Sequence, residues 1–258
     1  MLFANNSPNN KANKRRISKG LSHVYIDAFA GAGFHLSKTK GEMVRGSPLN
    51  ALLVQPPFKE YHLIDLNGDK VDLLESRVGT RNDVYFYKGD CNHVLLEDVF
   101  PLVRFQDYRR GLCLLDPYKL TLDWEVIQKA GSMKSLELFI NFPIHDINRT
   151  VLHHRPEKVS AANITRMNAF GGDESWREVA YEESQTLFGV DLEKVSNPRF
   201  AEAFRQRLKR VAGFKRVPEP LPMRNSKKST VYYLFFASQK GTAEDIVRYI
   251  FDKFGTQH

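Results

Sequence analysis

The chain has 258 residues, 42% of them hydrophobic and 26% charged, and its formal net charge at pH 7 is +8. This size predicts one α/β domain with an insertion rather than two independent domains. No apolar run approaches the ~20 residues of a membrane span, so we expect no membrane partner. Cys91 and Cys113 are too few for a disulfide framework or a four-thiolate metal site, and we expect a cytoplasmic protein without a metal.

The positive charge is concentrated in three segments. Residues 1–20 are basic and polar and lack the apolar centre of a secretory signal, so we expect a disordered tail. The other two basic segments are residues 205–216 and 224–228. Basic clusters attract polyanions, which favours nucleic acid as a partner. The alternative is an ordinary soluble protein with a basic isoelectric point.

Residues 24–33 predict a buried strand followed by a tight turn. The strand contains aromatic and β-branched residues and ends at Asp27. In the turn, Gly31 and Gly33 would let the backbone approach a ligand, where a Cβ atom would collide. Open α/β sheets bind ligands at the carboxyl ends of their strands. We therefore expect the turn to hold a ligand, the alternative being a turn that binds nothing.

Two common nucleotide-binding patterns do not match this turn. A dinucleotide-binding turn has a third glycine, and Leu36 occupies that position here. The phosphate-binding pattern of P-loop enzymes does not occur in the sequence. The order aromatic-x-Asp-x-Phe-Ala-Gly-x-Gly at residues 25–33 instead resembles the first motif of class I S-adenosylmethionine (SAM) methyltransferases. In those enzymes the turn lies under the methionine moiety.

The segments that follow alternate between strand and helix patterns. Residues 35–47 are mainly polar and predict a loop. Ser47 is suited to cap the next helix, and Pro48 to occupy its first position. Strands are predicted over 61–65, 84–87, 111–118 and 136–143, and a helix over 69–78. This alternation predicts a parallel sheet with helices on both faces.

Residues 144–217 interrupt the alternation. They are polar, rich in helical patterns and too long for a crossover, so we expect a helical insertion, or cap, after the fifth strand. Within it, a buried helix face is predicted for Phe200, Phe204, Leu208 and Val211. A proline-rich edge segment (217–222), a strand (230–237) and a closing helix (242–254) follow. The predicted divisions are the tail (1–20), a SAM-binding core (21–143), the insertion (144–217) and C-terminal elements that complete the core (218–258).

Acidic residues stand at the ends of three successive predicted strands: Asp27, Asp65 and Asp90. In a parallel sheet these ends meet at one crevice. An acid after the second strand can accept hydrogen bonds from both ribose hydroxyls, and one after the third can reach an adenine amino group. Each acid alone is also explained as a helix cap or a turn residue. Their common register favours adenosyl binding.

The fourth predicted strand closes on Leu115-Asp116-Pro117-Tyr118. Class I enzymes that methylate exocyclic amino groups of bases have Asp/Asn-Pro-Pro-Tyr/Phe at this place. There the acid and a backbone carbonyl accept hydrogen bonds from the amine, and the aromatic ring stacks on the base. Here the second proline is missing, so Tyr118 comes one position early. An Asp-Pro turn that only ends a buried strand is the alternative.

Together these motifs resemble the three-Cys-motif partner protein family (TcmP), which is methyltransferase-like and found beside a partner with a three-cysteine motif. The resemblance depends on residues 26–33, 46–49, 89–92, 115–118 and 140–143. It implies a Rossmann-like class I methyltransferase fold with a mostly parallel seven-stranded sheet, SAM as cofactor, and nucleic acid and a three-Cys-motif protein as partners. The implied cofactor contacts are Asp27, Phe29, Gly31, Gly33, Asp65 and Asp90. The implied substrate side comprises the catalytic Asp116, Pro117 and Tyr118, and Lys119, Asn141 and Pro143.

Three functional hypotheses follow. The first is a SAM-dependent methyltransferase that acts on nucleic acid or on a partner-bound substrate, and base amino methylation at Asp116, Pro117 and Tyr118 is one reaction that it could catalyse. The second is a methyltransferase fold that binds a partner protein or nucleic acid without catalysing transfer. The third is a nucleotide-dependent oxidoreductase, which Leu36 disfavours.

Overall fold

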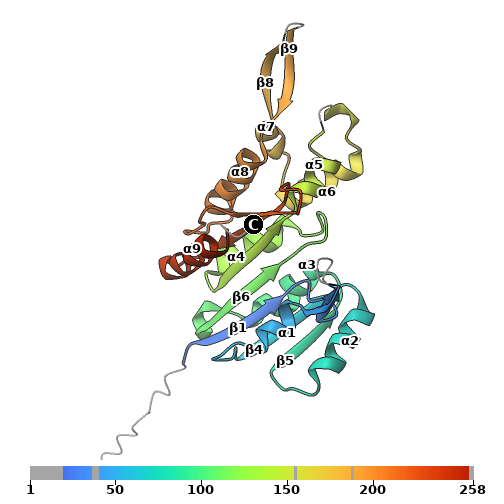
Figure 1. Cartoon of the computed structure of the whole chain (residues 1–258). Coiled ribbons are helices and arrows are strands. Elements are labelled where there is room, and N and C mark those ends of the chain that lie inside the picture. The colour runs from blue at the N-terminus through green and yellow to red at the C-terminus, as the bar shows by residue number, and fades with distance from the viewer. Residues whose placement is uncertain (1–19, 37–40, 154–155, 187–188, 256–258) are drawn as a thin grey trace, which may run out of the picture.

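A seven-stranded sheet forms the centre of the computed structural model, with the order β10-β11-β7-β6-β1-β4-β5 (Figure 1). The structure describes residues 20–36, 41–153, 156–186 and 189–255, so the predicted tail lies outside it except for Gly20. Strands β1, β4, β5, β6 and β7 pair in parallel, and β11 is antiparallel to both its neighbours. The strands are β1 (Ser22–Asp27), β4 (Glu60–Asp65), β5 (Val84–Lys88), β6 (Arg109–Leu115), β7 (Leu136–Phe142), β10 (Leu221–Arg224) and β11 (Thr230–Ala237).

Helices cover both faces of this sheet. In β1, Tyr25 points to one face and Ile26 to the other, because successive side chains of a strand alternate. The Tyr25 face packs on α1 (Ser47–Ala51) and α2 (Gly68–Val78), and the Ile26 face packs on α4 (Trp124–Met133). The parallel core, the antiparallel β11 and the two helical layers confirm the predicted Rossmann-like class I methyltransferase fold.

Helix α2 shows how local sequence fixes these elements. Asn67 accepts a hydrogen bond from the Lys70 N–H at the N-cap, and Gly79 ends the helix with φ at 73°. Val71 and Leu74 are buried against the sheet at helical spacing. The predicted helix over 69–78 is confirmed.

Short helical segments form several of the remaining connections. They are α3 (Cys91–His93), the π-helical segment Val94–Val99, and the 3₁₀ segments Phe100–Leu102, Phe105–Asp107 and Pro156–Lys158. They were not predicted. The first three follow one another without a break over residues 91–102, and the other two are single turns, which show too little periodicity.

The predicted loop over 35–47 contains a small antiparallel hairpin instead. Its strands are β2 (Phe34–Leu36) and β3 (Met43–Arg45), and residues 37–40 lie outside the described chain. The expected cap at Ser47 is wrong. Gly46, which has no side chain to form a cap, is the N-cap of α1, and Ser47 is the first residue of the helix, with its hydroxyl bonded to Asp27.

The insertion after β7 contains a hairpin in addition to the predicted helices. Its helices are α5 (Ile144–Thr150), α6 (Ala161–Gly171), α7 (Trp176–Ala180) and α8 (Asn197–Arg210). Between α7 and α8, β8 (Tyr181–Thr186) and β9 (Gly189–Lys194) pair antiparallel and project away from the sheet (Figure 1). The hairpin was missed because β8 is polar and has few β-branched residues.

The predicted buried face of α8 is confirmed for Phe200, Phe204 and Leu208. The ring centroids of Phe204 and Phe142 are 4.6 Å apart, which joins the insertion to the core of the sheet. Val211 was expected on the same face but is 45% exposed, because α8 ends at Arg210.

The closing helix α9 (Gly241–Gly255) confirms the prediction over 242–254. Val247 and Phe251 are buried with Phe236 of β11, so the helix packs on one face of the sheet at the β10–β11 end. No helix in the described part of the chain has the length and apolar character to cross a membrane.

Candidate functional site

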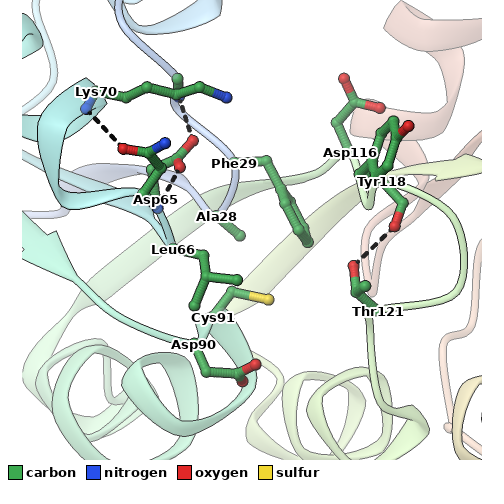
Figure 2. A pocket seen from close by; sticks show the side chains of 12 residues that line it. Ala28, Phe29, Asp65, Leu66, Lys70, Asp90, Cys91, Asp116, Tyr118 and Thr121 are labelled. Carbon is green, nitrogen blue, oxygen red and sulfur yellow. Dashed lines mark hydrogen bonds between the residues drawn. The ribbon is translucent and has the colours of Figure 1, made fainter.

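A cavity of about 670 Å³ lies at the carboxyl ends of β1, β4, β5 and β6 (Figure 2). This is the crevice at which open α/β sheets bind ligands, and its volume is in the range of small-molecule sites. It is lined by Ala28, Phe29, Gly31, Asp65, Leu66, Asn67, Lys70, Asp90, Cys91, Asp116, Tyr118 and Thr121. Residues far apart in the sequence are therefore brought to one place, as the motif spacing predicts.

Asp27 does not line this cavity but lies under the turn after β1. It is 1% exposed and accepts hydrogen bonds from the Tyr25 hydroxyl (3.1 Å) and the Phe29 N–H (3.2 Å). Burial raises the pKa of its carboxyl to about 6, although the bonds from Ser47, Phe29 and Tyr25 favour the charged form. Asp27 thus holds the shape of the turn rather than facing a ligand.

The two glycines of the turn have different surroundings. Gly31 has φ at +61° and lines the cavity, and a Cβ added there would have no atom within 4 Å. Gly33 has φ at +81°, and an added Cβ would lie 2.7 Å from Cδ1 of Leu74. Gly31 leaves space at the cavity, whereas Gly33 allows α2 to pack against the turn.

Asp65 connects the turn to the end of β4. Its Oδ2 accepts a hydrogen bond from the Gly31 N–H (2.9 Å), and its Oδ1 accepts one from the Asn67 N–H (2.8 Å). Each carboxylate oxygen has a second lone pair, so Asp65 can also accept bonds from ligand hydroxyls. Leu66 is 75% exposed beside it and gives the wall an apolar surface.

Asp90, which follows β5, is the N-cap of α3 and also lines the cavity. Its Oδ1 accepts hydrogen bonds from the Asn92 N–H (2.8 Å) and the His93 N–H (3.4 Å). Cys91 also lines the cavity, and burial raises the pKa of its thiol to about 12. A thiol held in this neutral form is a poor nucleophile.

Asn92 links α3 to the loop after β6. Its Nδ2 donates to the carbonyl oxygen of Thr121 (2.9 Å), and its Oδ1 accepts from the Asp123 N–H (2.8 Å). Thr121 Oγ1 in turn donates to the Tyr118 carbonyl oxygen (3.1 Å). The loop that contains Asp116 and Tyr118 is therefore fastened beside the cavity.

Asp116 and Tyr118 lie at the mouth of the cavity, on the wall opposite Asp65 (Figure 2). Asp116 is exposed, Pro117 is buried, and Tyr118 is 76% exposed. Lys119 has φ at +64°, and its Nζ lies 5.3 Å from the centroid of the Tyr118 ring. Lys119 itself is not among the residues that line the cavity.

Asn141 is the neighbour of Asp116 on β7. Its Nδ2 donates to Oδ1 of Asp116, and its own Oδ1 is buried and accepts no hydrogen bond from the described residues. Pro143 is buried at the N-cap of α5 and lies outside the cavity lining. Asn141 is thus connected to the site by its hydrogen bond to Asp116, whereas Pro143 does not line the cavity.

Sequence reasoning missed several residues at the rim. Three of them are Leu66, Asn67 and Lys70, which lie within five residues after Asp65. The sequence signal that could have found them is their position where the second predicted strand passes into the helix that follows it. Tyr232 of β11 was also missed. Burial raises the pKa of its hydroxyl, and the negative charge of Asp116 adds to this rise. Only the antiparallel insertion of β11 beside β7 brings it to this rim.

Comparison with known proteins supports the fold. No family model matches the chain, and no curated protein matches it. Protein LPL1258 from Legionella pneumophila str. Philadelphia 1, assigned to DUF519, is similar in structure with a TM-score of 0.52 and 10% identity over 91% of this chain and 84% of that one.

Two more distant structural likenesses are to proteins described as methyltransferases. A proposed SAM-dependent methyltransferase from Listeria monocytogenes has a TM-score of 0.45 and 11% identity, over 86% of this chain and 92% of its own. A SAM-dependent methyltransferase from Mesorhizobium loti has a TM-score of 0.41 and 12% identity, over 84% of this chain and 90% of its own. The order and directions of the chain's own strands give it the Rossmann-like class I methyltransferase fold.

Proposed function

We propose that the protein is a SAM-dependent methyltransferase that acts on a nucleic-acid base presented at Asp116, Pro117 and Tyr118. The main support is the single cavity at the carboxyl ends of the parallel strands, where Gly31, Asp65 and Asp90 lie opposite this motif. The donors and acceptors around it suit an adenosyl group.

The residues of the cavity fit SAM. Asp65 would accept hydrogen bonds from the ribose hydroxyls, and Asp90 one from the adenine amino group. Leu66 would contact the adenine ring, and the open space at Gly31 would admit the ligand close to the backbone. When bound, SAM supplies a methyl group on a sulfonium, and the electron pair of the broken bond returns to sulfur.

The residues on the β6 side would position the acceptor. Asp116 would accept a hydrogen bond from an exocyclic amine and orient the nitrogen lone pair that forms the new bond to carbon. The amine proton then leaves to Asp116 or to solvent. Tyr118 would stack on the base, and Asn141 would hold the Asp116 carboxylate in place.

The sequence resemblance to the TcmP family adds a partner to this proposal. We include a cytoplasmic protein with a three-cysteine motif as a second component of the active assembly. The residues 26–33, 46–49, 89–92, 115–118 and 140–143 support this part of the proposal.

Methyl transfer from radiolabelled SAM tests the proposal directly. The protein is incubated with fractionated cellular DNA, RNA and protein, with and without the partner. We expect label in a nucleic-acid fraction for the wild type and none for Asp116→Ala. Label only in protein, or none in any fraction with the partner present, would contradict the proposal.

One observation favours a second function. The Asp-Pro-Tyr motif lacks the second proline, and Tyr118 is 76% exposed rather than packed over the cavity. A methyltransferase fold that only binds a partner or nucleic acid would tolerate this change. Biological activity that survives Asp116→Ala with binding intact would support this function.

A further inference from the structure

The turn between β10 and β11 lies at the same rim of the sheet as the cavity. Because β11 is antiparallel to β7, with Tyr233 opposite Phe142, the start of β11 is at the carboxyl end of β7. β10 ends at Arg224 and β11 begins at Thr230, so the turn that joins them is at this end too. We call residues 224–229 the basic turn.

Asn225 gives the basic turn one defined shape. Its Oδ1 accepts hydrogen bonds from the N–H groups of Lys227 (3.0 Å) and Ser229 (3.1 Å). Its carbonyl oxygen accepts one from the Lys228 N–H (2.9 Å), and Lys228 has φ at 60°. The two lysines are therefore held on a preorganised loop.

The cations of the basic turn are not neutralised by nearby acids. Arg224, Lys227 and Lys228 are exposed, and none forms a salt bridge within the part of the chain that the structure describes. In the other basic segment three of the cations form salt bridges, namely Arg205 with Glu202, Arg207 with Asp173 and Arg216 with Glu244. The basic turn therefore offers positive charge without a salt bridge at the end of the sheet where the cavity lies.

Tyr232 connects the basic turn to the candidate site. It lies two residues after Thr230, and the charge of Asp116 helps to raise its pKa. Beyond Asp116 comes Tyr118, with the Lys119 ammonium 5.3 Å from its ring centroid. The rim thus presents the exposed Tyr118 ring with Lys119 beside it, and the basic turn lies at the same end of the sheet.

We infer that the basic turn binds the backbone phosphates of a single-stranded nucleic acid whose target base lies at Tyr118. This inference rests on the proposed function, because the same rim would present the base to the cavity. An unpaired base has a free face that can stack on an aromatic ring, whereas a base in a duplex does not. Arg224, Lys227 and Lys228 would supply the phosphate contacts.

The test compares two double variants of the full chain. Lys227→Gln with Lys228→Asn removes two charges from the basic turn, and asparagine tolerates the left-handed backbone at 228. The control is Lys129→Gln with Lys134→Asn. Lys134 also has a positive φ, at 59°, but it precedes β7 and so lies at the opposite rim.

Binding is measured by fluorescence anisotropy of fluorescein-labelled single-stranded DNA and RNA of about 20 nucleotides over a salt series. With a slope of about 0.7 for each phosphate contact in single strands, loss of two contacts lowers the slope of log K against log salt by about 1.4. Affinity near physiological salt should then fall roughly tenfold. The control variant should match the wild type.

Three results of the binding series would each overturn the inference. These are absence of oligonucleotide binding by the wild type, an unchanged slope in the basic-turn variant, and an equal loss in the control. Displacement of the probe by poly-glutamate as readily as by unlabelled oligonucleotide would also overturn it, in favour of an acidic protein partner. SAM titration of the same samples separates the two proposals, since failure to bind SAM contradicts the proposed function without removing the phosphate contacts.

Discussion

The two sides of the cavity rim use their side chains in opposite ways. On the β1–β4 side, the carboxylates of Asp27 and Asp65 accept hydrogen bonds from backbone N–H groups of the turn. On the β6–β7 side, Asp116 and Tyr118 are exposed, and Asp116 is held by Asn141. The first side, which we call the fixed side, is thus held by hydrogen bonds within the turn. The second, the open side, is exposed, and under the proposed function we expect the specificity for the acceptor there.

The largest expected effect is on the open side. Asp116→Ala should lower methyl transfer by about 10²–10⁴-fold and leave SAM affinity unchanged, because Asp116 would act only on the acceptor. Asn141→Ala should cause a smaller loss, since Asn141 is a positioning residue that acts through Asp116. Single-turnover rates and SAM titrations measure both effects. A matching loss of SAM affinity would place Asp116 on the cofactor side instead.

On the fixed side, the expected signature is a pH dependence of stability. Burial raises the pKa of Asp27 from 3.8 to about 6, so the folded state holds this proton more tightly than the unfolded state. The stabilisation from this group is therefore present below pH 3.8 and is lost as pH rises through about 6. The difference corresponds to about 3 kcal/mol.

The variant Asp27→Asn cannot ionise and should not show this dependence. Its free energy of unfolding relative to wild type should increase by about 3 kcal/mol between about pH 4 and about pH 7, as measured by urea denaturation. Parallel pH profiles for the two proteins would show that Asp27 is not a buried ionising group.

Substitutions at the two glycines of the turn should distinguish an effect on packing from an effect on ligand access. Gly33→Ala should destabilise the fold by about 2–3 kcal/mol, because the new Cβ meets Leu74 and the backbone has a positive φ. Gly31→Ala should cost only about 1 kcal/mol, since no atom lies near its Cβ position. Thermal unfolding and SAM titration should show stability lost at Gly33 and affinity lost at Gly31. Equal effects at both positions would contradict this division.

The smallest expected effect concerns the link between the two sides. Asn92→Ala removes the hydrogen bonds to Thr121 and Asp123 and should loosen the loop after β6 by about 1–2 kcal/mol. Hydrogen exchange of residues 117–123 should become faster. The control Asn163→Ala, which removes a bond to the Thr150 carbonyl in the insertion, should leave that exchange unchanged. Unchanged exchange in Asn92→Ala would show that the loop is held by other contacts.

Much of the core could be predicted from the sequence because its signals are local. A buried strand that closes on an acid recurs along the sequence. Because parallel strands end at one rim of the sheet, Asp65, Asp90 and Asp116 line the same cavity. The predicted roles of these residues stay predictions. The sequence did not show that Asp27 lies beneath the turn, since a residue at a strand end can point to either side of the chain.

Features that depend on which strands pair with one another were harder to predict. The β8–β9 hairpin has a polar sequence, and β2–β3 has only three residues in each strand. The position of Tyr232 follows from β11 entering the sheet beside β7 in the antiparallel direction. Gly33 looked like a ligand contact because its motif did not show that Leu74 would occupy the adjacent space.

Isothermal titration with SAM and S-adenosylhomocysteine tests the central claim most directly. The account predicts one site per chain for the wild type and for the Lys129→Gln, Lys134→Asn control, and weaker binding for Asp65→Ala and Gly31→Ala. No heat at millimolar ligand, or unaltered affinity in both cavity variants, would contradict a SAM site at this rim.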